Sequence, residues 1–219
     1  MPTPEAIDTR ALIARLAHQL RNPLATLKSG LQLAQRLTRP EGDLAEALEA
    51  MLPEIGRIDR LLRRAQQYVA LEPPGLPPPR TDVGEAAAAV AARRWPAADR
   101  TIAVEGGPAC TVGVGARDLE LALAELLANA VRFAPAGTLV RVRWSAAAGG
   151  VAIEVADEGP GIAPHILDKL PAPYHSTDPD ATGMGIAIAS RIAGLAGGRL
   201  AWHSAPGAGA RFTLLLPGS

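Results

Sequence analysis

The stretch Leu71–Arg80, LEPPGLPPPR, separates two parts of the chain that have different sequence patterns. Proline fixes the backbone φ angle and lacks an N–H group, so a proline run ends a helix and forms a stiff, extended linker. The sequence therefore predicts a first domain at residues 1–72, a linker at 73–80 and a second domain at 81–219.

The part before the linker has the periodicity of two long helices. Apolar residues recur in steps of three and four from Ile13 to Ala34 and again from Leu44 to Val69. Pro40, Gly42 and Asp43 predict a tight turn between the helices, with Asp43 as the N-cap of the second one. One antiparallel hairpin cannot cover both apolar stripes, so we expect pairing with a second copy into a dimeric four-helix bundle.

The part after the linker alternates helical and extended patterns. Helices are predicted at 82–94, 117–133 and 185–196, and strands at 101–105, 138–144, 151–156, 199–203 and 210–216. This interleaving predicts a single α/β layer domain, and the whole chain is therefore expected to be α+β.

Composition and charge narrow the classes of partner. The 22 basic and 22 acidic residues balance, which gives no support for nucleic-acid binding. The sequence has no apolar run of about 18–20 residues and no basic-then-apolar leader pattern, so we expect a cytoplasmic protein without membrane insertion. Cys110 is the single cysteine and has no metal-ligating residues at useful spacing, so it is interpreted as a small packed thiol.

The stretch Leu16–Leu24, LAHQLRNPL, places a histidine off the apolar stripe of the first helix. On a helical wheel His18 lies about 140° and Asn22 about 180° from the centre of that stripe, so the two side chains share an outward face. An exposed imidazole can act as a nucleophile near neutral pH. An ordinary surface histidine is the alternative.

Three stretches of the second domain carry residues suited to a nucleotide. Glu125 and Asn129 in ELLANAVRF, Glu125–Phe133, lie on one helix face and can hold Mg²⁺, and Arg132 can meet phosphate oxygens. In VADEGPGI, Val155–Ile162, Asp157 follows a strand and can accept a hydrogen bond from the amino group of a base. The alternatives are a solvated helix face and an ordinary Asp-Gly loop.

The third stretch is TGMGIAIASRI, Thr182–Ile192, a glycine loop that opens a helix and offers backbone amides to an anion. Gly159 and Gly161 in the second stretch let a flat ring approach the backbone without a Cβ in the way. The intervening segment 163–181 is long enough to form a lid over a bound nucleotide.

In this order and spacing, these stretches resemble the sequence boxes of two-component sensor histidine kinases. His18–Leu24 resembles their H-box, Glu125–Phe133 their N-box, Asp157–Ile162 their G1 box, and Thr182–Ile186 their G2 box. The resemblance implies a GHKL-type (Bergerat) ATP-binding α/β sandwich after the phosphoacceptor hairpin.

The resemblance also implies roles for individual residues. His18 would accept the γ-phosphoryl group of ATP, assisted by Gln19, and pass it to an aspartate of a response regulator, and Asn22 would serve dephosphorylation of that regulator. Asn129, with Glu125, would bind Mg²⁺, and Asp157 would bind the adenine amino group. The full set expected to contact ATP is Glu125, Asn129, Arg132, Phe133, Asp157, Gly159, Gly161, Ile162, Thr182, Gly183, Met184 and Gly185.

Two residues depart from the family pattern. The position after the histidine is usually acidic, and Gln19 can orient by hydrogen bonding but is no useful base. Glu125 stands where the family often has asparagine, and in related ATPases a glutamate at this spacing activates water. About seventeen residues precede His18, too few for an input domain, so the signal is expected from a separate sensory partner, from another chain or from a portion of the protein outside this sequence. The competing interpretations are a histidine phosphotransfer module with a vestigial ATP domain, and a GHKL-type ATPase without phosphohistidine.

Overall fold

The computed structural model describes residues 9–36, 42–93, 95, 101–176, 178 and 181–218. The chain divides into two compact units, each described by itself below. The helical unit spans Ile7–Ala70 and also includes Pro173–Met184; the sheet unit comprises Leu71–Ala172 and Gly185–Ser219. In the part of the chain that the structure describes, no helix is long and apolar enough to cross a membrane.

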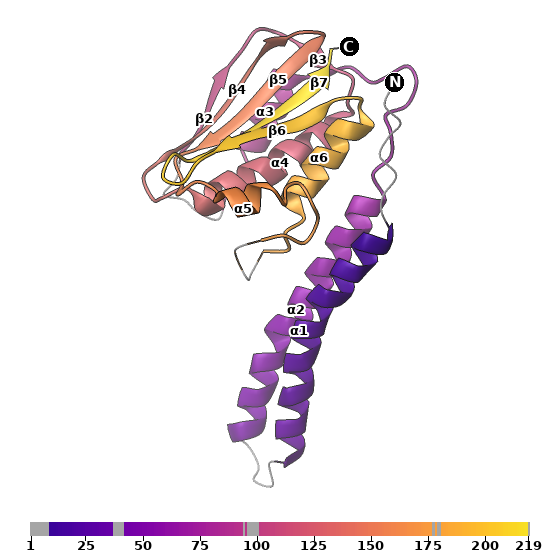
Figure 1. Cartoon of the computed structure of the whole chain (residues 1–219), viewed down its shortest axis with the longest axis vertical. Coiled ribbons are helices and arrows are strands. Elements are labelled where there is room, and N and C mark those ends of the chain that lie inside the picture. The colour runs from indigo at the N-terminus through magenta and orange to yellow at the C-terminus, as the bar shows by residue number, and fades with distance from the viewer. Residues whose placement is uncertain are drawn as a thin grey trace. The chain divides into compact units, whose positions relative to one another are not determined.

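The helical unit is built on a hairpin of α1 (Thr9–Arg36) and α2 (Gly42–Val69), which lie side by side in Figure 1. Leu61 and Ala65 of α2 are buried. Ile55, Leu62 and Val69, which belong to the predicted apolar stripe of α2, are exposed in the single chain, as are Leu24 and Leu31 of α1. The hairpin therefore leaves apolar side chains of both helices uncovered.

α2 begins at Gly42, one residue before the predicted N-cap Asp43, whose side chain lies outside the described residues. Pro40, which the predicted turn includes, lies outside the described residues. So do the side chains of Ile13, Ala34, Leu44 and Leu48, which belong to the predicted stripes.

The sheet unit contains a mixed five-stranded sheet with the order β2-β4-β5-β7-β6. Its strands are β2 (Thr101–Gly106), β4 (Leu139–Ala147), β5 (Gly150–Asp157), β6 (Arg199–Ser204) and β7 (Ala210–Pro217). Only the β2–β4 pair is parallel; the other three pairs in this sheet are antiparallel. All five predicted strands are present, and the predicted α+β class is confirmed.

Three helices cover one face of this sheet, as Figure 1 shows: α3 (Val83–Ala91), α4 (Ala116–Phe133) and α6 (Gly185–Leu195). The core lies between them and the sheet, because β5 and β7 alternate buried and more exposed residues while the helices turn apolar faces toward the sheet. Its largest fully buried side chains include Leu119, Leu123, Leu126, Leu127, Ile153, Ile188, Phe212 and Leu214.

Short elements were missing from the sequence prediction. β1 (Thr81–Asp82) pairs with β3 (Thr111–Val112), and the four-residue helix α5 (Pro164–Leu167) lies after β5. A two-residue strand has no measurable periodicity, because alternation needs at least four positions to be recognised. Asp82 ends β1 and caps α3, its Oδ1 accepting a hydrogen bond from the Glu85 N–H at 2.9 Å.

Candidate functional site

Asp157 is the last residue of β5, and its carboxylate is fixed by the backbone around it. Oδ1 accepts hydrogen bonds from the N–H of Gly159 at 2.8 Å and from the N–H of Ala210, its partner on β7, at 3.3 Å. The side chain is only 9% exposed, and this burial raises the pKa of Asp157, while the two backbone hydrogen bonds oppose the rise. Oδ2 has no hydrogen-bond partner among the described residues, so an acceptor remains for a ligand.

Gly159 joins the turn after β5 to the end of α4. A Cβ at this position would lie 2.7 Å from Asp157 Oδ1 and 2.9 Å from the carbonyl oxygen of Phe133. The glycine therefore allows the G1-like stretch to pack directly on the last residue of the N-box-like stretch. The structure brings these two predicted pieces together through close backbone packing.

Gly161 and Ile162 continue the turn and are held by the end of β6 and by the loop between β6 and β7. Gly161 has φ +74°, and a Cβ there would collide with the Ala205 carbonyl oxygen. The Ile162 N–H donates to Ser204 Oγ at 2.9 Å, and the Ser204 hydroxyl donates to the Gly209 carbonyl at 2.6 Å. Ser204 and Ala210 were not among the predicted site residues, although the pairing of β5 with β7 would have placed Ala210 opposite Asp157.

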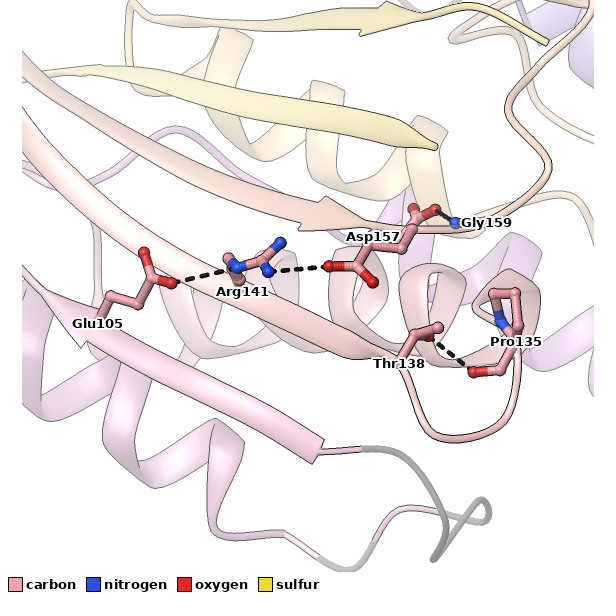
Figure 2. Close-up of polar contacts among 7 residues, drawn as sticks. Glu105, Pro135, Thr138, Arg141, Asp157 and Gly159 are labelled. Carbon is pink, nitrogen blue, oxygen red and sulfur yellow. Dashed lines mark hydrogen bonds and ion pairs between the residues drawn. The ribbon is translucent and has the colours of Figure 1, made fainter. Parts of the chain in front are cut away.

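Arg141 of β4 forms ion pairs with two acidic residues beside this turn. Its guanidinium pairs with Glu105 of β2 at 3.3 Å (Figure 2) and with Glu158 at 2.8 Å. Glu158 thus pairs with Arg141 on the adjacent strand, while Asp157 accepts a hydrogen bond from Gly159 (Figure 2). Sequence reasoning missed Arg141, because only the register of β4 against β5 places it near this turn.

The N-box-like residues lie along the last turns of α4. Glu125 is buried, Asn129 and Phe133 are half-buried, and Arg132 is exposed. A Cβ on Gly185 would lie 2.9 Å from Glu125 Oε2, so the carboxylate sits against the first residue of α6. The N-terminus of a helix carries partial positive charge, which stabilises an anion at this place.

Donors for a divalent cation are few. Among the described residues, no group of three or more His, Cys, Asp or Glu side chains could hold a metal ion. Glu125 and Asn129, one helical turn apart, offer a carboxylate and an amide oxygen. Such a pair fits Mg²⁺ that takes its remaining ligands from phosphate and water, and does not fit an all-protein cage.

The G2-like stretch is divided between the two units. Thr182, Gly183 and Met184 belong to residues 173–184 of the helical unit, and Gly185 begins α6 in the sheet unit. Thr182 and Gly183 are half-buried, and Met184 is fully buried. Gly183 has φ +66°, a conformation that glycine adopts at no steric cost.

The H-box-like residues lie on α1. Gln19 is half-buried, and its Nε2 donates to the backbone carbonyl oxygen of Tyr174 at 3.4 Å. Asn22 is exposed, in agreement with its predicted outward position. The side chain of His18 lies outside the described part of the structure, and its role stays a prediction.

Comparison with protein families gives two matches in chain order. Residues 8–74 match the His Kinase A (phospho-acceptor) domain, and residues 115–219 match the Histidine kinase-, DNA gyrase B-, and HSP90-like ATPase family. Together the two matches cover most of the chain. They include His18 and all the residues expected from the resemblance to contact ATP.

Individual relatives agree with this result. The chain is 30% identical over 211 residues to sensor histidine kinase ZraS of Klebsiella oxytoca, covering 94% of this chain and 45% of ZraS. It is 29% identical to sensor-type histidine kinase PrrB of Mycobacterium bovis, covering 99% of this chain and 50% of PrrB. The chain thus spans about half the length of these relatives.

A solved structure resembles the whole chain. Full-length ShkA in complex with AMPPNP matches with a TM-score of 0.63 at 26% identity, covering 100% of this chain and 46% of ShkA.

Proposed function

Because the chain belongs to the two-component sensor histidine kinases, we propose that it is an ATP-dependent protein-histidine kinase that phosphorylates its own His18. The observation that carries this proposal is the fixed carboxylate of Asp157. Two backbone amides hold Oδ1, and Oδ2 is left to accept a hydrogen bond from the amino group of adenine. An acceptor held in this way discriminates strongly for a ligand that donates to it.

The proposed site joins the end of α4 to the turn after β5. Asp157 reads the base, Gly159, Gly161 and Ile162 shape the turn, and Phe133 lies beside them at the end of α4. Arg132, Thr182, Gly183, Met184 and Gly185 are proposed to contact the remainder of ATP. The binding of AMPPNP by ShkA, a relative of similar fold, supports a nucleotide at this site.

Glu125 and Asn129 are proposed to hold Mg²⁺ together with the phosphates. When bound, the ion supplies positive charge to the phosphate oxygens, which lowers the repulsion that an attacking nucleophile meets. The buried carboxylate of Glu125 beside the start of α6 supports a role at the phosphate end of the nucleotide.

The phosphoryl transfer is proposed to proceed in two steps. A neutral imidazole nitrogen of His18 attacks the γ-phosphorus, the bond to the bridging oxygen of ADP breaks, and the proton on the other ring nitrogen passes to solvent. An aspartate carboxylate of a response regulator then attacks the phosphorus, the P–N bond breaks, and the departing imidazole takes a proton from solvent. Gln19 and Asn22 would position groups by hydrogen bonding, since neither side chain ionises.

The domain organisation completes the proposal. We assign the phosphoacceptor and dimerisation hairpin to residues 1–72, the linker to 73–80 and the catalytic domain to 81–219. The exposed apolar side chains of Ile55, Leu62 and Val69 support a homodimer through the hairpin. A separate sensory partner would supply the signal, and the cytoplasm is the proposed location.

The test is incubation with γ-labelled ATP and Mg²⁺, followed by acid and alkali treatment of the protein. Acid-labile, alkali-stable label that disappears in His18→Gln is the expected result. His165→Gln, which changes an exposed histidine of α5, is the matched control and should retain the label. Label that persists in His18→Gln, or that resists acid, would contradict the assignment.

A further inference from the structure

Ser204 lies in the same row of the sheet as Asp157. Ala210 of β7 pairs with Asp157 of β5 on one side and with Ser204 of β6 on the other. The hydroxyl of Ser204 and the carboxylate of Asp157 are therefore separated by a single strand. Both residues end their strands, at the edge where the turn after β5 and the loop 205–209 between β6 and β7 meet.

The Ser204 hydroxyl joins this turn to this loop. Its Oγ accepts a hydrogen bond from the Ile162 N–H at 2.9 Å and donates one to the Gly209 carbonyl oxygen at 2.6 Å. A hydroxyl can accept and donate at the same time, whereas an alanine side chain can do neither. The bridge between the two segments therefore depends on the hydroxyl group of residue 204.

The same two segments supply the hydrogen bonds that hold the Asp157 carboxylate. The Gly159 N–H belongs to the turn, and the Ala210 N–H directly follows Gly209 of the loop. The bond from Ala210, at 3.3 Å, is longer than the bond from Gly159, at 2.8 Å, so a small shift of the loop weakens it first. The direction in which Asp157 presents Oδ2 thus depends on the spacing that Ser204 maintains.

Backbone contacts also pack the loop on the turn. The Gly207 N–H donates to the Pro160 carbonyl oxygen at 2.7 Å. Gly209 has φ +72°, and a Cβ there would collide with the Asp157 carbonyl oxygen. These contacts do not involve the Ser204 side chain, so loss of its hydroxyl should loosen the loop and leave the sheet folded.

We propose that Ser204 is a positioning residue for recognition of the nucleotide base. Its hydroxyl fixes the turn after β5 against the loop 205–209, and in this way it fixes the carboxylate of Asp157 toward the amino group of the base. This inference rests on the proposed function and adds a residue that acts through Asp157. Discrimination between bases is therefore the property that should depend on Ser204.

The test compares two nucleotides that differ by one amino group. ADP carries the amino group that Asp157 is proposed to bind, and purine riboside 5′-diphosphate lacks it. Isothermal titration of the full chain with Mg²⁺ gives both Kd values, and we expect ADP to bind at least about tenfold more tightly. Ser204→Ala should lower this ratio about threefold to tenfold, the range that one net hydrogen bond supplies, by raising the Kd of ADP alone.

Thr81→Val is the matched control for loss of a hydroxyl. Thr81 is buried, and its Oγ1 donates to the Val114 carbonyl oxygen at 2.6 Å, before the start of α4, whereas Asp157 lies near the end of that helix. Thr81→Val should lower the unfolding temperature and leave the ratio of Kd values unchanged. Ser204→Thr keeps a hydroxyl and should retain the ratio of the unsubstituted protein.

Ser204→Cys, which has a similar shape and weaker hydrogen bonds, replaces Ser204→Ala if that variant does not fold, and it should lower the ratio in the same direction. An unchanged ratio in the folded Ser204 variants would overturn the role of Ser204. An equal fall in Thr81→Val would also overturn it, because the ratio would then follow stability. An unsubstituted protein that does not bind ADP, or that binds both nucleotides equally, would overturn the proposed function instead.

Discussion

The substitution Asp157→Asn should weaken binding of the nucleotide base and leave the stability of the fold nearly unchanged. The backbone N–H groups of Gly159 and Ala210 both point at Oδ1, so they select the orientation in which the asparagine carbonyl oxygen takes their hydrogen bonds. The amide NH₂ group then replaces Oδ2, and a donor faces the amino group of the base. The substitution keeps the shape of the side chain and reverses the hydrogen bond that the ligand needs.

The magnitudes follow from these contacts. Both backbone hydrogen bonds remain, although they lose the strengthening given by a charged acceptor, so the free energy of unfolding should change by about 1 kcal/mol or less. Loss of the ligand hydrogen bond together with an unsatisfied donor in its place costs about 2–4 kcal/mol, which raises the Kd of the nucleotide about 30-fold to 1,000-fold.

Isothermal titration with AMPPNP and Mg²⁺ measures the Kd of the nucleotide, and thermal unfolding measures the change in the free energy of unfolding. The matched control is Glu158→Gln, which removes the adjacent acid and its ion pair with Arg141 at the surface and should leave the Kd nearly unchanged. An Asp157→Asn protein that unfolds normally and binds the nucleotide with unchanged affinity would refute the assignment of Asp157 to the base.

Three further results are expected. Burial raises the pKa of Asp157 in the folded state, so the folded protein binds this proton more tightly than the unfolded chain. The contribution of Asp157 to stability should therefore fall as the pH rises above the ordinary value of 3.8, and thermal unfolding across the acid range should show this fall as the difference between the unsubstituted protein and Asp157→Asn. Light scattering should give the mass of two chains, and Ile55→Glu, on the exposed stripe of α2, should give the mass of one; a monomeric unsubstituted protein would contradict the bundle. Asn22→Ala should retain autophosphorylation and lose about ten- to a hundredfold in dephosphorylation of the response regulator. If stability and both activities fall together, Asn22 instead supports the helix next to Pro23.

Long elements were predictable from the sequence because their periodicity extends over several turns or alternations. The step pattern from Leu44 to Val69 gave a helix, and the alternation at 210–216 gave β7. α2 begins at Gly42, within one residue of the predicted cap at Asp43, since residue preferences for caps locate a helix end only to within a residue or two. The predicted stripes identified apolar residues, but they did not show that Leu61 would be buried in the hairpin while Leu62 stayed exposed.

The candidate site was predictable where one short stretch carries the chemistry, as at Asp157. It was not predictable where the function depends on contacts between distant stretches. Ala210 and Arg141 enter only through strand register, and the contact between Gln19 and Tyr174 joins residues 155 positions apart. Gly159 and Gly161 were interpreted as space for a flat ring, and the structure gives them a second reason, because a Cβ would meet Phe133 or Ala205.

The position of β7 has a consequence for how the protein folds as it leaves the ribosome. β7 is the last strand in chain order, yet it lies between β5 and β6 and pairs with both. The five-stranded sheet therefore cannot complete its strand pairing until residues 210–217 have left the ribosome. The helices α1 and α2 are made before the sheet, and their contacts join residues of shorter sequence separation. Until β7 has been made, the apolar faces of α4 and β5 remain partly uncovered. Ribosome stalling shortly before Ala210 should thus leave a chaperone-binding, protease-sensitive nascent chain with an already protected hairpin.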